Sequence, residues 1–458
     1  MKPLIISLIV ENNLCIGCGV CAALCPDSIL DMRFNKYGEY NPVAISNCTK
    51  NCRICLNVCP FVNENPNEDE IGQDLYGSTE GINYRPEIGY FISSYVGHSL
   101  INGHRENGAS GGMATWFLAK LLEEKQVDYV ISVTHTNDPN KLFQYKEFKS
   151  VEELRSSSGS VYYPVELSGV INHILKTPGK YAIIGLPCFI KALRLAQKRN
   201  RNLQKRVVIT LGLTCGQTKS KHYTAYLSAV AGLKGMPVRV KFRGKDLNRT
   251  ARDYYFLCSD SNGKDVRLFL SELPFNVWVN RWFTPFSCNY CDDVFCETAD
   301  ITFMDAWLPE FSNDPNGTSF IISRSSEVEK MLNLNLQSNK VSLEKIDIIP
   351  LIMSKKGVID SKKKDIAFRL YINRSKLEII PKKRIDPKFS FNLLKIWRIQ
   401  IITSMQEKSR NFVPNPAYSM NDVHNLKKEM KKDLIQIRIL RFLSFPVRVY
   451  RYIGELIL

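Results

Sequence analysis

Apolar and polar residues follow two different periods in the central part of the chain, residues 87–350. Short apolar segments rich in β-branched residues are typical of buried strands, and apolar residues repeated every three or four positions are typical of helices. The expected strands are residues 127–134, 181–186, 207–213, 238–242 and 300–307. The expected helices are residues 112–125, 188–198 and 219–232. This alternation predicts a mixed α/β domain.

Changes in composition divide the chain into four parts. Residues 1–62 carry closely spaced cysteines, and residues 63–86 are polar and proline-rich, which indicates a linker. Residues 87–350 form the expected α/β domain, and residues 351–458 form a basic extension with helical patterns. A chain of 458 residues is long enough for two or three folded units.

The net charge of +17 is concentrated in the carboxy-terminal extension. Beyond residue 350 the chain has 24 Lys and Arg but only 9 Asp and Glu, a local excess of +15. The first 350 residues therefore carry a net charge of only +2. Because the basic character belongs to the extension, net charge alone does not indicate nucleic-acid binding, and no specific nucleic-acid partner is predicted.

Helical patterns in the extension combine cationic and apolar side chains at residues 381–411 and 424–453. Residues 434–443 predict a basic amphipathic helix. Three interpretations of this helix stay open: a solvated helix that caps the core, a helix on an anionic membrane surface, or a contact with a partner subunit or nucleic acid. No run of 18 apolar residues occurs, so no membrane-spanning segment is predicted.

Cysteine usage indicates a reducing compartment. Disulfide frameworks are typical of short secreted domains, whereas this chain is long and has 14 cysteines in clusters. The apolar opening at residues 4–10 is followed directly by Glu11 without a small-residue cleavage site, so no signal peptide is expected. A cytoplasmic location is predicted, with peripheral attachment at the inner membrane surface if the extension binds lipid.

The first eight cysteines form two copies of the C-x2-C-x2-C-x3-C-P pattern by which bacterial ferredoxins bind 4Fe–4S clusters. The second copy has one extra residue in its first gap. In this arrangement the last cysteine of each copy binds the cluster of the other copy. The two predicted ligand sets are Cys15, Cys18, Cys21 and Cys59, and Cys25, Cys48, Cys52 and Cys55. Zinc also binds four thiolates, but usually through two C-x2-C pairs a dozen or more residues apart, so the spacing favours iron–sulfur clusters.

A glycine-rich turn at residues 107–112 precedes the first expected helix. Backbone N–H groups in such a turn can approach an anion, and the helix dipole adds to the attraction. Ser110, Gly111 and Gly112 are therefore candidates for phosphate binding, and the alternative is a turn that simply packs against the core. The serine-rich turn at residues 156–160 is a second candidate phosphate or ribityl contact. No G-x-G-x-x-G follows an expected strand, so a Rossmann site is not predicted.

Five cysteines of the central part are candidates for a third site. Cys188 and Cys215 each follow an expected strand, where open α/β sheets place ligands. Cys288, Cys291 and Cys296 lie within nine residues, so a 4Fe–4S cluster there needs one distant ligand. We favour Cys215 over Cys188 for this position. Two alternatives stay open. One is a zinc site with the same ligands, and the other, for Cys188 and Cys215, is a buried cysteine that packs as a small apolar side chain and binds no metal.

Together these motifs resemble the coenzyme F420 hydrogenase/dehydrogenase beta-subunit family over roughly residues 10–330. The resemblance is carried by the double ferredoxin motif, the turn at 110–112, residues 185–188 and 212–215, the cysteine run at 288–296, and residues 299–301 and 305–307. Leu186 stands where the family often has threonine, and the extension beyond about residue 350 is not part of the shared core.

The resemblance implies that the central domain binds FAD in a non-Rossmann fold beside a third 4Fe–4S cluster. It implies that Ser110, Gly111 and Gly112 lie near the flavin and that Cys188 flanks it. The expected fold class is therefore α+β, with a bacterial ferredoxin-like domain, a mixed α/β flavin domain and a basic helical tail. Founding members act on a deazaflavin, other relatives reduce chlorophyll derivatives, and bacterial members occur in cell-surface polysaccharide gene sets.

The predicted function is that of an iron–sulfur flavoprotein oxidoreductase. It would pass electrons between ferredoxin-type clusters and a two-electron acceptor through FAD, with cell-surface polysaccharide metabolism as one setting. The expected partners are a redox donor or acceptor protein and a small-molecule acceptor. The alternatives are a non-catalytic electron-relay subunit of a larger redox complex and a zinc-stapled binding protein.

Overall fold

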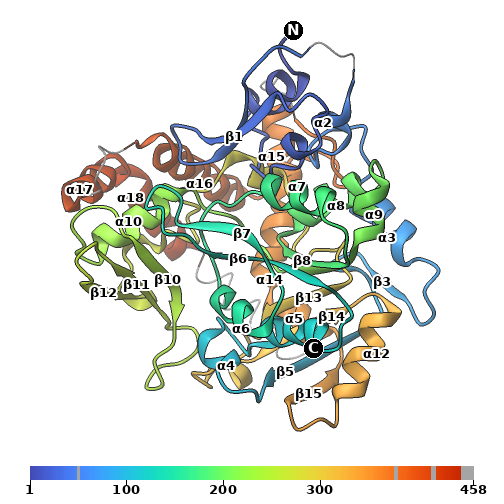
Figure 1. Ribbon diagram of the computed structural model, residues 1–458. Helices are drawn as coiled ribbons and strands as arrows, with labels where there is room; N and C mark the ends of the chain where they lie inside the picture. The colour runs from blue at the N-terminus through green and yellow to red at the C-terminus, as the bar shows by residue number, and fades with distance from the viewer. Residues whose placement is uncertain (49–51, 376–379, 414–418, 445–458) are drawn as a thin grey trace.

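An eight-stranded mixed sheet forms the centre of the molecule (Figure 1). The computed structural model describes residues 1–48, 52–375, 380–413 and 419–444. From edge to edge the strands are β15 (Val341–Ile346), β5 (Ser93–Ser99), β14 (Ser319–Ser323), β13 (Ile301–Asp305), β9 (Val207–Leu213), β8 (Tyr181–Gly185), β6 (Tyr129–His135) and β7 (Phe143–Phe148). β13, β9, β8 and β6 are parallel to one another, and the strands on either side of them are antiparallel.

The four central parallel strands are those that the hydrophobic pattern predicts, and the fifth expected strand, residues 238–242, is part of β10 (Arg239–Gly244). The three expected helices are also present, as α5 (Met113–Glu123), α8 (Pro187–Gln197) and α10 (Lys221–Val230). The mixed α/β character of the central part is thereby confirmed. The bounds of its domains stay a prediction.

Helices cover both faces of the sheet, and the residues of each strand alternate between them. Val130 and Ile184 pack in the same apolar cluster as α5 and α12 (Ser326–Asn335). Their sequence neighbours Ile131 and Ile183 instead pack with α8 and α7 (Ser168–Lys176). The carboxyl ends of β8, β9 and β13 lie between these layers and lead directly into the segments that carry the candidate site.

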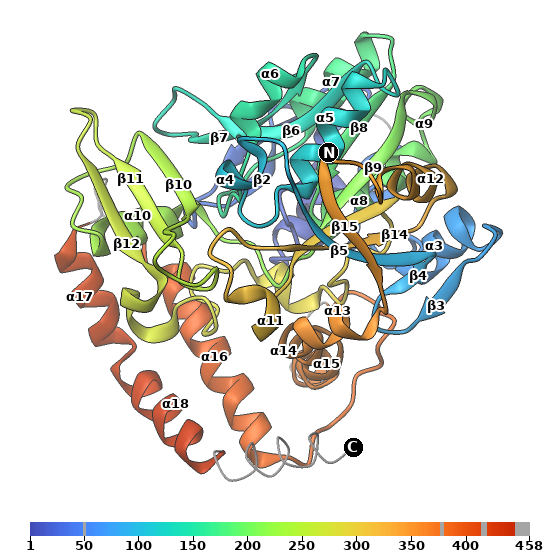
Figure 2. The same ribbon diagram turned by 90° about the horizontal axis from the view of Figure 1, so that it is seen from below.

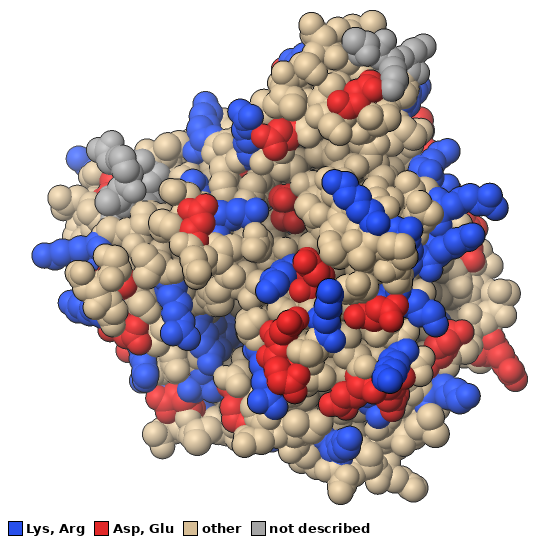
Figure 3. Space-filling view, in the orientation of Figure 1, with Lys and Arg blue, Asp and Glu red and all other residues tan. Residues whose placement is uncertain are grey.

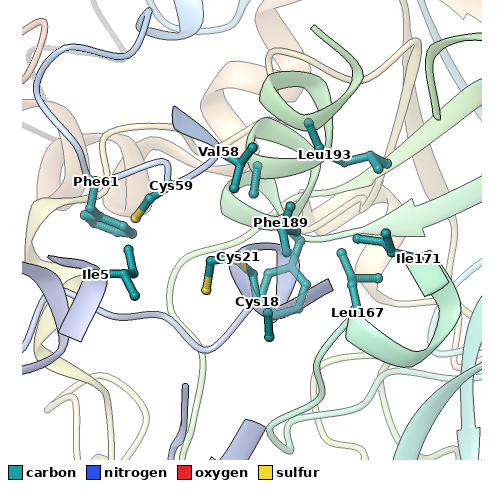
Figure 4. Packing of buried hydrophobic residues seen from close by; sticks show 14 of the residues in the cluster. Ile5, Cys18, Cys21, Val58, Cys59, Phe61, Leu167, Ile171, Phe189 and Leu193 are labelled. Carbon is teal, nitrogen blue, oxygen red and sulfur yellow. The ribbon is translucent and has the colours of Figure 1, made fainter. Parts of the chain in front are cut away.

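The amino-terminal part packs on the face covered by α7 and α8. It contains the hairpin of β1 (Leu30–Phe34) and β2 (Tyr40–Ala44) and the short helices α1 (Val20–Ala23) and α2 (Ile54–Asn57). Its apolar side chains share one cluster with those of α7 and α8. Figure 4 shows this junction, with Ile5, Val58 and Phe61 from the amino-terminal part and Phe189 and Leu193 from α8.

Residues 63–86, which the sequence predicts to be a linker, contain the helix α3 (Glu68–Tyr76) and the strand β3 (Asn83–Arg85), which pairs with β4 (Gly89–Phe91). Asn67 and Glu70 form a capping box at the start of α3. Ile71 and Tyr76 are almost completely buried. The polar composition therefore belongs to a packed helix and its cap, which a count of polar and proline residues does not distinguish from a loop.

The carboxy-terminal helices pack beside a second sheet made of β10, β11 (Tyr255–Ser259) and β12 (Asp265–Phe269). These helices are α16 (Leu393–Asn411), α17 (Met420–Glu429) and α18 (Lys431–Leu443), and Figure 2 shows α16 and α18 side by side. Leu434, Ile437 and Leu440 of α18 are buried in the same apolar cluster as this sheet, whereas Phe442 is 81% exposed. The amphipathic helix expected at residues 434–443 therefore caps the core, and contact with a membrane surface stays a prediction.

The other helices are short or join the main layers. They are α4 (His104–Asn107), α6 (Val151–Leu154), α9 (Arg201–Arg206), α11 (Pro309–Ser312), α13 (Ile349–Ser354), α14 (Lys356–Ile359) and α15 (Asp365–Ser375). Among the described residues, every helix is too short or too polar to cross a membrane.

Candidate functional site

The first predicted ligand set surrounds a small apolar pocket in the amino-terminal part. The thiols that line it are Cys15, Cys18, Cys21 and Cys59. The backbone N–H of Gly17 donates to the Cys15 Sγ over 3.3 Å, and Gly17 has a φ of +75°, which favours glycine. Figure 4 shows Cys18, Cys21 and Cys59 at the junction with α7 and α8. The structure thus brings together three cysteines of the first motif and the last cysteine of the second.

The environment of these thiols fits a bound cluster. Burial raises the pKa of Cys18 to about 12 and raises the pKa of Cys21 well above its usual value. The charges of neighbouring thiols add to both shifts, because several thiolates would share one apolar pocket. Iron binds the thiolate form and removes this repulsion, so metal binding and deprotonation are coupled here.

The second predicted set lies around α2 and is more open to solvent. Cys25, Cys48, Cys52 and Cys55 are all partly exposed. Burial raises the pKa of Cys55, and the charges of Cys52 and Cys25 add to the rise, so these three thiols are neighbours. The backbone N–H of Cys48 donates to the Met1 carbonyl over 2.8 Å. The pKa of Cys21 is raised mainly by burial, then by the thiols of its own set, and least by Cys55 of the second set. The two sets are therefore adjacent.

A third group of thiols comes from three separate segments. Cys188 is the second residue of α8, Cys215 follows β9, and Cys288 and Cys291 lie in and just after the short helix η5 (Phe286–Tyr290). Burial raises the pKa of Cys188 well above its usual value, and the charges of Cys291, Cys215 and Cys288 add to the rise. Burial also raises the pKa of Cys215 to about 12, with Cys288 and Cys291 again contributing. These mutual effects place the four thiols in one neighbourhood, although within the described residues no three Cys, His, Asp or Glu side chains are close enough to hold a metal ion as they stand.

Cys296 lies to one side of this group, although its spacing predicts it as a ligand. Its side chain is completely buried and packs with Ile190 and Ala299. Cys296 has a φ of +52°, and its side chain lies against Gly212 of β9. A Cβ atom added to Gly212 would be only 2.4 Å from the Cys296 Cβ. Burial is the largest cause that raises the pKa of Cys296. The charge of Asp293 raises it further, and the charge of Cys215 raises it by a smaller amount. The charges of Cys288 and Cys291 are among the causes of the Cys188 pKa shift and not of the Cys296 pKa shift, and the identity of the ligands stays a prediction.

Two buried cations lie beside the third group. The Nζ of Lys362 donates to the carbonyl oxygens of Cys215 and Asp293 over 3.0 and 2.5 Å. Arg281 is 8% exposed, and its Nε and Nη2 have no hydrogen-bond partner within the described residues. Burial lowers the pKa of Arg281, and the Cys288 and Cys215 thiolates oppose this shift. A cluster bound by four thiolates is an anion, so unpaired buried donors at this position fit a 4Fe–4S cluster.

The third group lies between the first set and a central cavity. The pKa of Cys188, raised mainly by burial, also responds to the charge of Cys18. Phe189, the next residue, packs in the same apolar cluster as Cys18 and Cys21 (Figure 4). On its other side the third group reaches the cavity, because Cys215 is one of the residues that line it. The thiols therefore form a continuous series from the outer second set to the cavity wall.

The cavity has a volume of about 430 Å³ and lies at the carboxyl ends of β8, β9 and β13. This volume is in the usual range for small-molecule sites. Its walls are rich in aromatic side chains, among them Tyr162, Tyr163, Tyr254, Trp278 and Trp307. The serine-rich turn contributes Ser157, Gly159 and Ser160 to the lining. Aromatic walls and polar turns of this kind fit a planar ring system with polar substituents.

The predicted flavin contacts are divided between the cavity and its surroundings. Ser110 and Gly112 line the cavity, whereas Gly111 and Cys188 are not among the lining residues. The N–H of Gly111 donates to the Ser319 Oγ over 3.1 Å, so this residue packs against β14. Cys188 instead lies with the third thiol group. Within the turn at residues 107–112, Gly108, Ala109, Ser110 and Gly112 are therefore placed to touch a ligand, and Gly111 is not.

The charges of the cavity wall suit an anionic ligand. Its two acidic residues, Asp305 and Glu39, each accept a hydrogen bond from a buried arginine, over 2.7 and 2.8 Å. Lys219 and Lys355 also belong to the wall, and neither forms an ion pair with a carboxylate of the described chain. A ligand with an anionic group would supply the negative charge that this set of residues lacks.

The glycine at position 111 leaves no room for a side chain. A Cβ there would lie 2.7 Å from the Gly97 carbonyl oxygen and 2.8 Å from the Ser319 backbone nitrogen. We expect Gly111→Ala to lower the free energy of unfolding by about 1–3 kcal/mol, because the crowded atoms belong to two strands that cannot easily move. Denaturant unfolding in the absence of oxygen measures this change.

Gly169→Ala in α7 is the matched control, since a Cβ at that position meets nothing within 4 Å. This helical substitution is expected to leave stability unchanged or to raise it by up to about 1 kcal/mol. Equal losses in the two variants would contradict the packing role of Gly111.

Cations of the extension neutralise a buried acidic cluster beside the third thiol group. Arg384 lies 3.0 Å from Asp292, 2.6 Å from Glu297 and 2.8 Å from Asp69. Lys383 lies 3.0 Å from Asp292, the residue after Cys291 in the sequence. On the face shown in Figure 3, cationic and acidic side chains are interspersed. Part of the basic excess of the extension therefore balances buried carboxylates, and the sequence pattern gave no signal of this.

Two family models match the central part of the chain. Both are described as coenzyme F420 hydrogenase/dehydrogenase, beta subunit: the model of its N-terminal part matches residues 94–172, and the model of its C-terminal part matches residues 179–348. Together the two ranges cover more than half of the chain.

Two curated relatives are matched over much of this chain. The chain is 21% identical over 234 residues to the F subunit of F(420)H(2) dehydrogenase from Methanosarcina mazei, covering 49% of this chain and 59% of that protein. It is 25% identical over 355 residues to coenzyme F420-dependent sulfite reductase of Methanocaldococcus jannaschii, covering 74% of this chain and 48% of that protein. The chain thus spans only 59% and 48% of the lengths of these relatives.

A ferredoxin and one solved structure are also similar. A ferredoxin of Methanocaldococcus jannaschii, described as uncharacterized, is 34% identical over 55 residues, which are 12% of this chain and 70% of that protein. A chain of the xenon-derivatised F420-reducing NiFe hydrogenase complex from Methanosarcina barkeri has a TM-score of 0.49 and 18% identity. That match covers 65% of this chain and 97% of the other.

The predicted resemblance is confirmed by the two family models, and the ferredoxin match supports the iron–sulfur and electron-transfer character that the cysteine motifs predict. FAD, the number of clusters and the identity of each ligand stay predictions. The chain belongs to the coenzyme F420 hydrogenase/dehydrogenase beta-subunit family.

Proposed function

We propose that this chain is an iron–sulfur flavoprotein oxidoreductase that passes electrons between ferredoxin-type clusters and a two-electron acceptor through FAD. The observation that carries the proposal is the position of Cys215. This thiol belongs to the third group and also lines the central cavity. A cluster at the third group would therefore border the ligand in the cavity, as electron transfer between them requires.

The proposal assigns three 4Fe–4S clusters to the three groups of thiols. Four cysteines would hold each cluster: Cys15, Cys18, Cys21 and Cys59 the first, Cys25, Cys48, Cys52 and Cys55 the second, and Cys188, Cys215, Cys288 and Cys291 the third. The second set is the most exposed, which suits exchange of electrons with a redox partner protein. Lys362 and Arg281 would balance the negative charge of the third cluster and so influence its reduction potential.

FAD, when bound, supplies the capacity to take up single electrons from clusters and to deliver a pair to an acceptor. The chain's own residues would hold and orient it. Aromatic side chains such as Tyr162 and Trp278 would pack against its rings and exclude water, and Ser110 and Gly112 would approach it from the turn before α5. Lys219, whose Nζ donates to the Trp282 carbonyl over 2.7 Å and whose pKa is lowered well below its ordinary value by burial, would supply an amine donor at the same wall.

The acceptor class follows from the relatives. The dehydrogenase and the sulfite reductase similar to this chain are both named for F420, so a deazaflavin is the first acceptor to test. A role in cell-surface polysaccharide metabolism, a cytoplasmic location and attachment to a membrane surface stay predictions from the sequence.

A relay subunit without its own acceptor is the second candidate function. It is favoured by one observation, that the Methanosarcina mazei relative is named as a subunit. In that case the chain would pass electrons to a partner that holds the active site. The relay function requires iron but no flavin, so the two functions differ in a measurable property.

An anaerobic absorption spectrum recorded before and after dithionite addition tests the proposal. We expect both cluster and flavin absorption, each bleaching on reduction at its own wavelengths. Cluster absorption without flavin would favour the relay function. Colourless protein that contains zinc would contradict both functions and favour a zinc-stapled binding protein.

A further inference from the structure

The carboxy-terminal extension contributes a wall of the central cavity. Ser354, Lys355 and Val358 all line it, and they lie just beyond residue 348, where the family match ends. The Oγ of Ser354 accepts a hydrogen bond from the backbone N–H of Trp307 over 3.1 Å, which fixes this wall to the end of β13. The cavity is therefore completed by residues that lie outside the ranges of the two family models.

Lys355 is a buried lysine that forms neither an ion pair nor a side-chain hydrogen bond with the described part of the chain. Only 7% of the residue is exposed, and it lies between α13 and α14. Within the described residues no hydrogen bond or ion pair is formed by its Nζ, which lies 5.7 Å from the centre of the Trp307 ring. The nearby carboxylate of Asp305 is engaged by Arg243 over 2.7 Å. The ammonium group thus faces the cavity with its hydrogen-bond capacity unused.

A buried ammonium group is costly unless an anion or strong acceptors surround it. Burial lowers the pKa of Lys355 to about 8, and Asp305 opposes this shift while Arg243 and Arg252 add to it. A ligand oxyanion next to the Nζ would supply the missing acceptors. Ser110 lines the same cavity, where its Oγ donates to the Thr318 carbonyl over 2.6 Å.

We propose that Lys355 is an oxyanion-binding residue of the cavity, supplied by the extension, which pairs with a phosphate or carboxylate group of the bound molecule. This inference rests on the proposed function and deepens it. The shared chemistry is a charge-assisted hydrogen bond from the Nζ to an anionic oxygen. The oxyanion comes either from the diphosphate of FAD or from an anionic group of the acceptor.

Two variants and one control test the assignment. Lys355→Met removes the charge and keeps most of the apolar stem, Lys355→Arg keeps the charge, and Lys340→Met changes an exposed lysine elsewhere. Their iron content should equal that of the unmodified chain, which verifies folding. The affinity for FAD is measured by quenching of flavin fluorescence. The accessibility of Lys355 is measured by amine acetylation and peptide mass spectrometry, with and without FAD or inorganic phosphate.

The two sources of the oxyanion give different results. If the flavin supplies it, Lys355→Met weakens FAD binding by about tenfold or more, Lys355→Arg largely restores it, and FAD alone protects Lys355 from acetylation. If the acceptor supplies it, FAD binds equally to all variants, and inorganic phosphate protects Lys355 in the FAD-loaded chain.

Acetylation that neither FAD nor phosphate reduces would overturn the assignment. The flavin-free chain separates this outcome from failure of the proposed function. If no flavin binds to the unmodified chain, the proposed function fails. Protection of Lys355 by inorganic phosphate would then still support an oxyanion site, and lack of protection would overturn that site.

Discussion

Replacing Cys188 with alanine is expected to remove about four of about twelve irons per chain, because the substitution takes one thiolate from the third cluster. The same loss is expected for Cys215→Ala. The first and second sets do not include either residue, so the signals of the amino-terminal clusters in electron paramagnetic resonance should remain after reduction. Reduction of the flavin by a protein donor should slow strongly in both variants, because the cluster beside the cavity is missing.

Cys296→Ala is the decisive comparison, since spacing alone places Cys296 with Cys288 and Cys291. We expect it to keep all of about twelve irons, because its thiol packs with Ile190 and Ala299 instead of joining the third group. Cys258→Ala, at a buried position in β11, controls for loss of a thiol as such. Full iron in Cys188→Ala combined with iron loss in Cys296→Ala would contradict the third set proposed here.

Replacing Arg384 with methionine is expected to lower the free energy of unfolding by about 3–5 kcal/mol, because buried carboxylates lose a shared partner. Arg384 is 10% exposed at its side chain and lies between Asp292 and Glu297, whose side chains are each 1% exposed. Each of these carboxylates keeps one other cation, Lys383 for Asp292 and Lys363 for Glu297. Guanidinium unfolding followed by tryptophan fluorescence without oxygen measures the loss.

Lys198→Met supplies the control for this variant. Its ion pair with Asp74 is open to solvent, with 42% and 59% of the two side chains exposed. Such pairs contribute about 0–1 kcal/mol, so a small change is expected. Similar losses in the two variants would show that Arg384 does not organise the acidic cluster.

The sequence predicts those parts of the fold in which local pattern and burial agree. The four parallel strands are mostly apolar, with single polar residues such as Thr210 and Thr302, as expected for strands covered on both faces, and each was predicted. β5 was not predicted, because Ser93, Ser94 and Ser99 interrupt its apolar pattern. These serines are buried in the sheet, and the Oγ of Ser94 donates to the Ile346 carbonyl of the neighbouring strand over 2.7 Å.

The spacing of cysteines predicts a set of metal ligands only where the ligands are close in sequence or belong to a known motif. The amino-terminal sets stay a prediction from two copies of one motif, and the structure places the four thiols of the first set around one pocket. The third group joins three distant segments, and the sequence marked both Cys188 and Cys215 as thiols at strand ends. Spacing could not show that Cys296 is completely buried beside Ile190, Ala299 and Gly212, because these neighbours come from distant segments or from the following turn.

The roles of the extension's cations could not be predicted from charge alone. Lys362 belongs to a run of three lysines that is typical of a solvated helix face, yet the residue is only 2% exposed and contacts the third thiol group. Arg410 likewise pairs with Glu39, 371 residues away. The tertiary fold determines such partners, so they cannot be predicted from the local sequence pattern.

The most direct test counts iron, acid-labile sulfide and flavin in protein that has been produced and purified without oxygen. The account predicts about twelve irons and about twelve sulfides per chain together with one FAD. Iron near eight with no flavin would contradict the link between the third thiol group and the cavity, and zinc without sulfide would contradict the redox account as a whole.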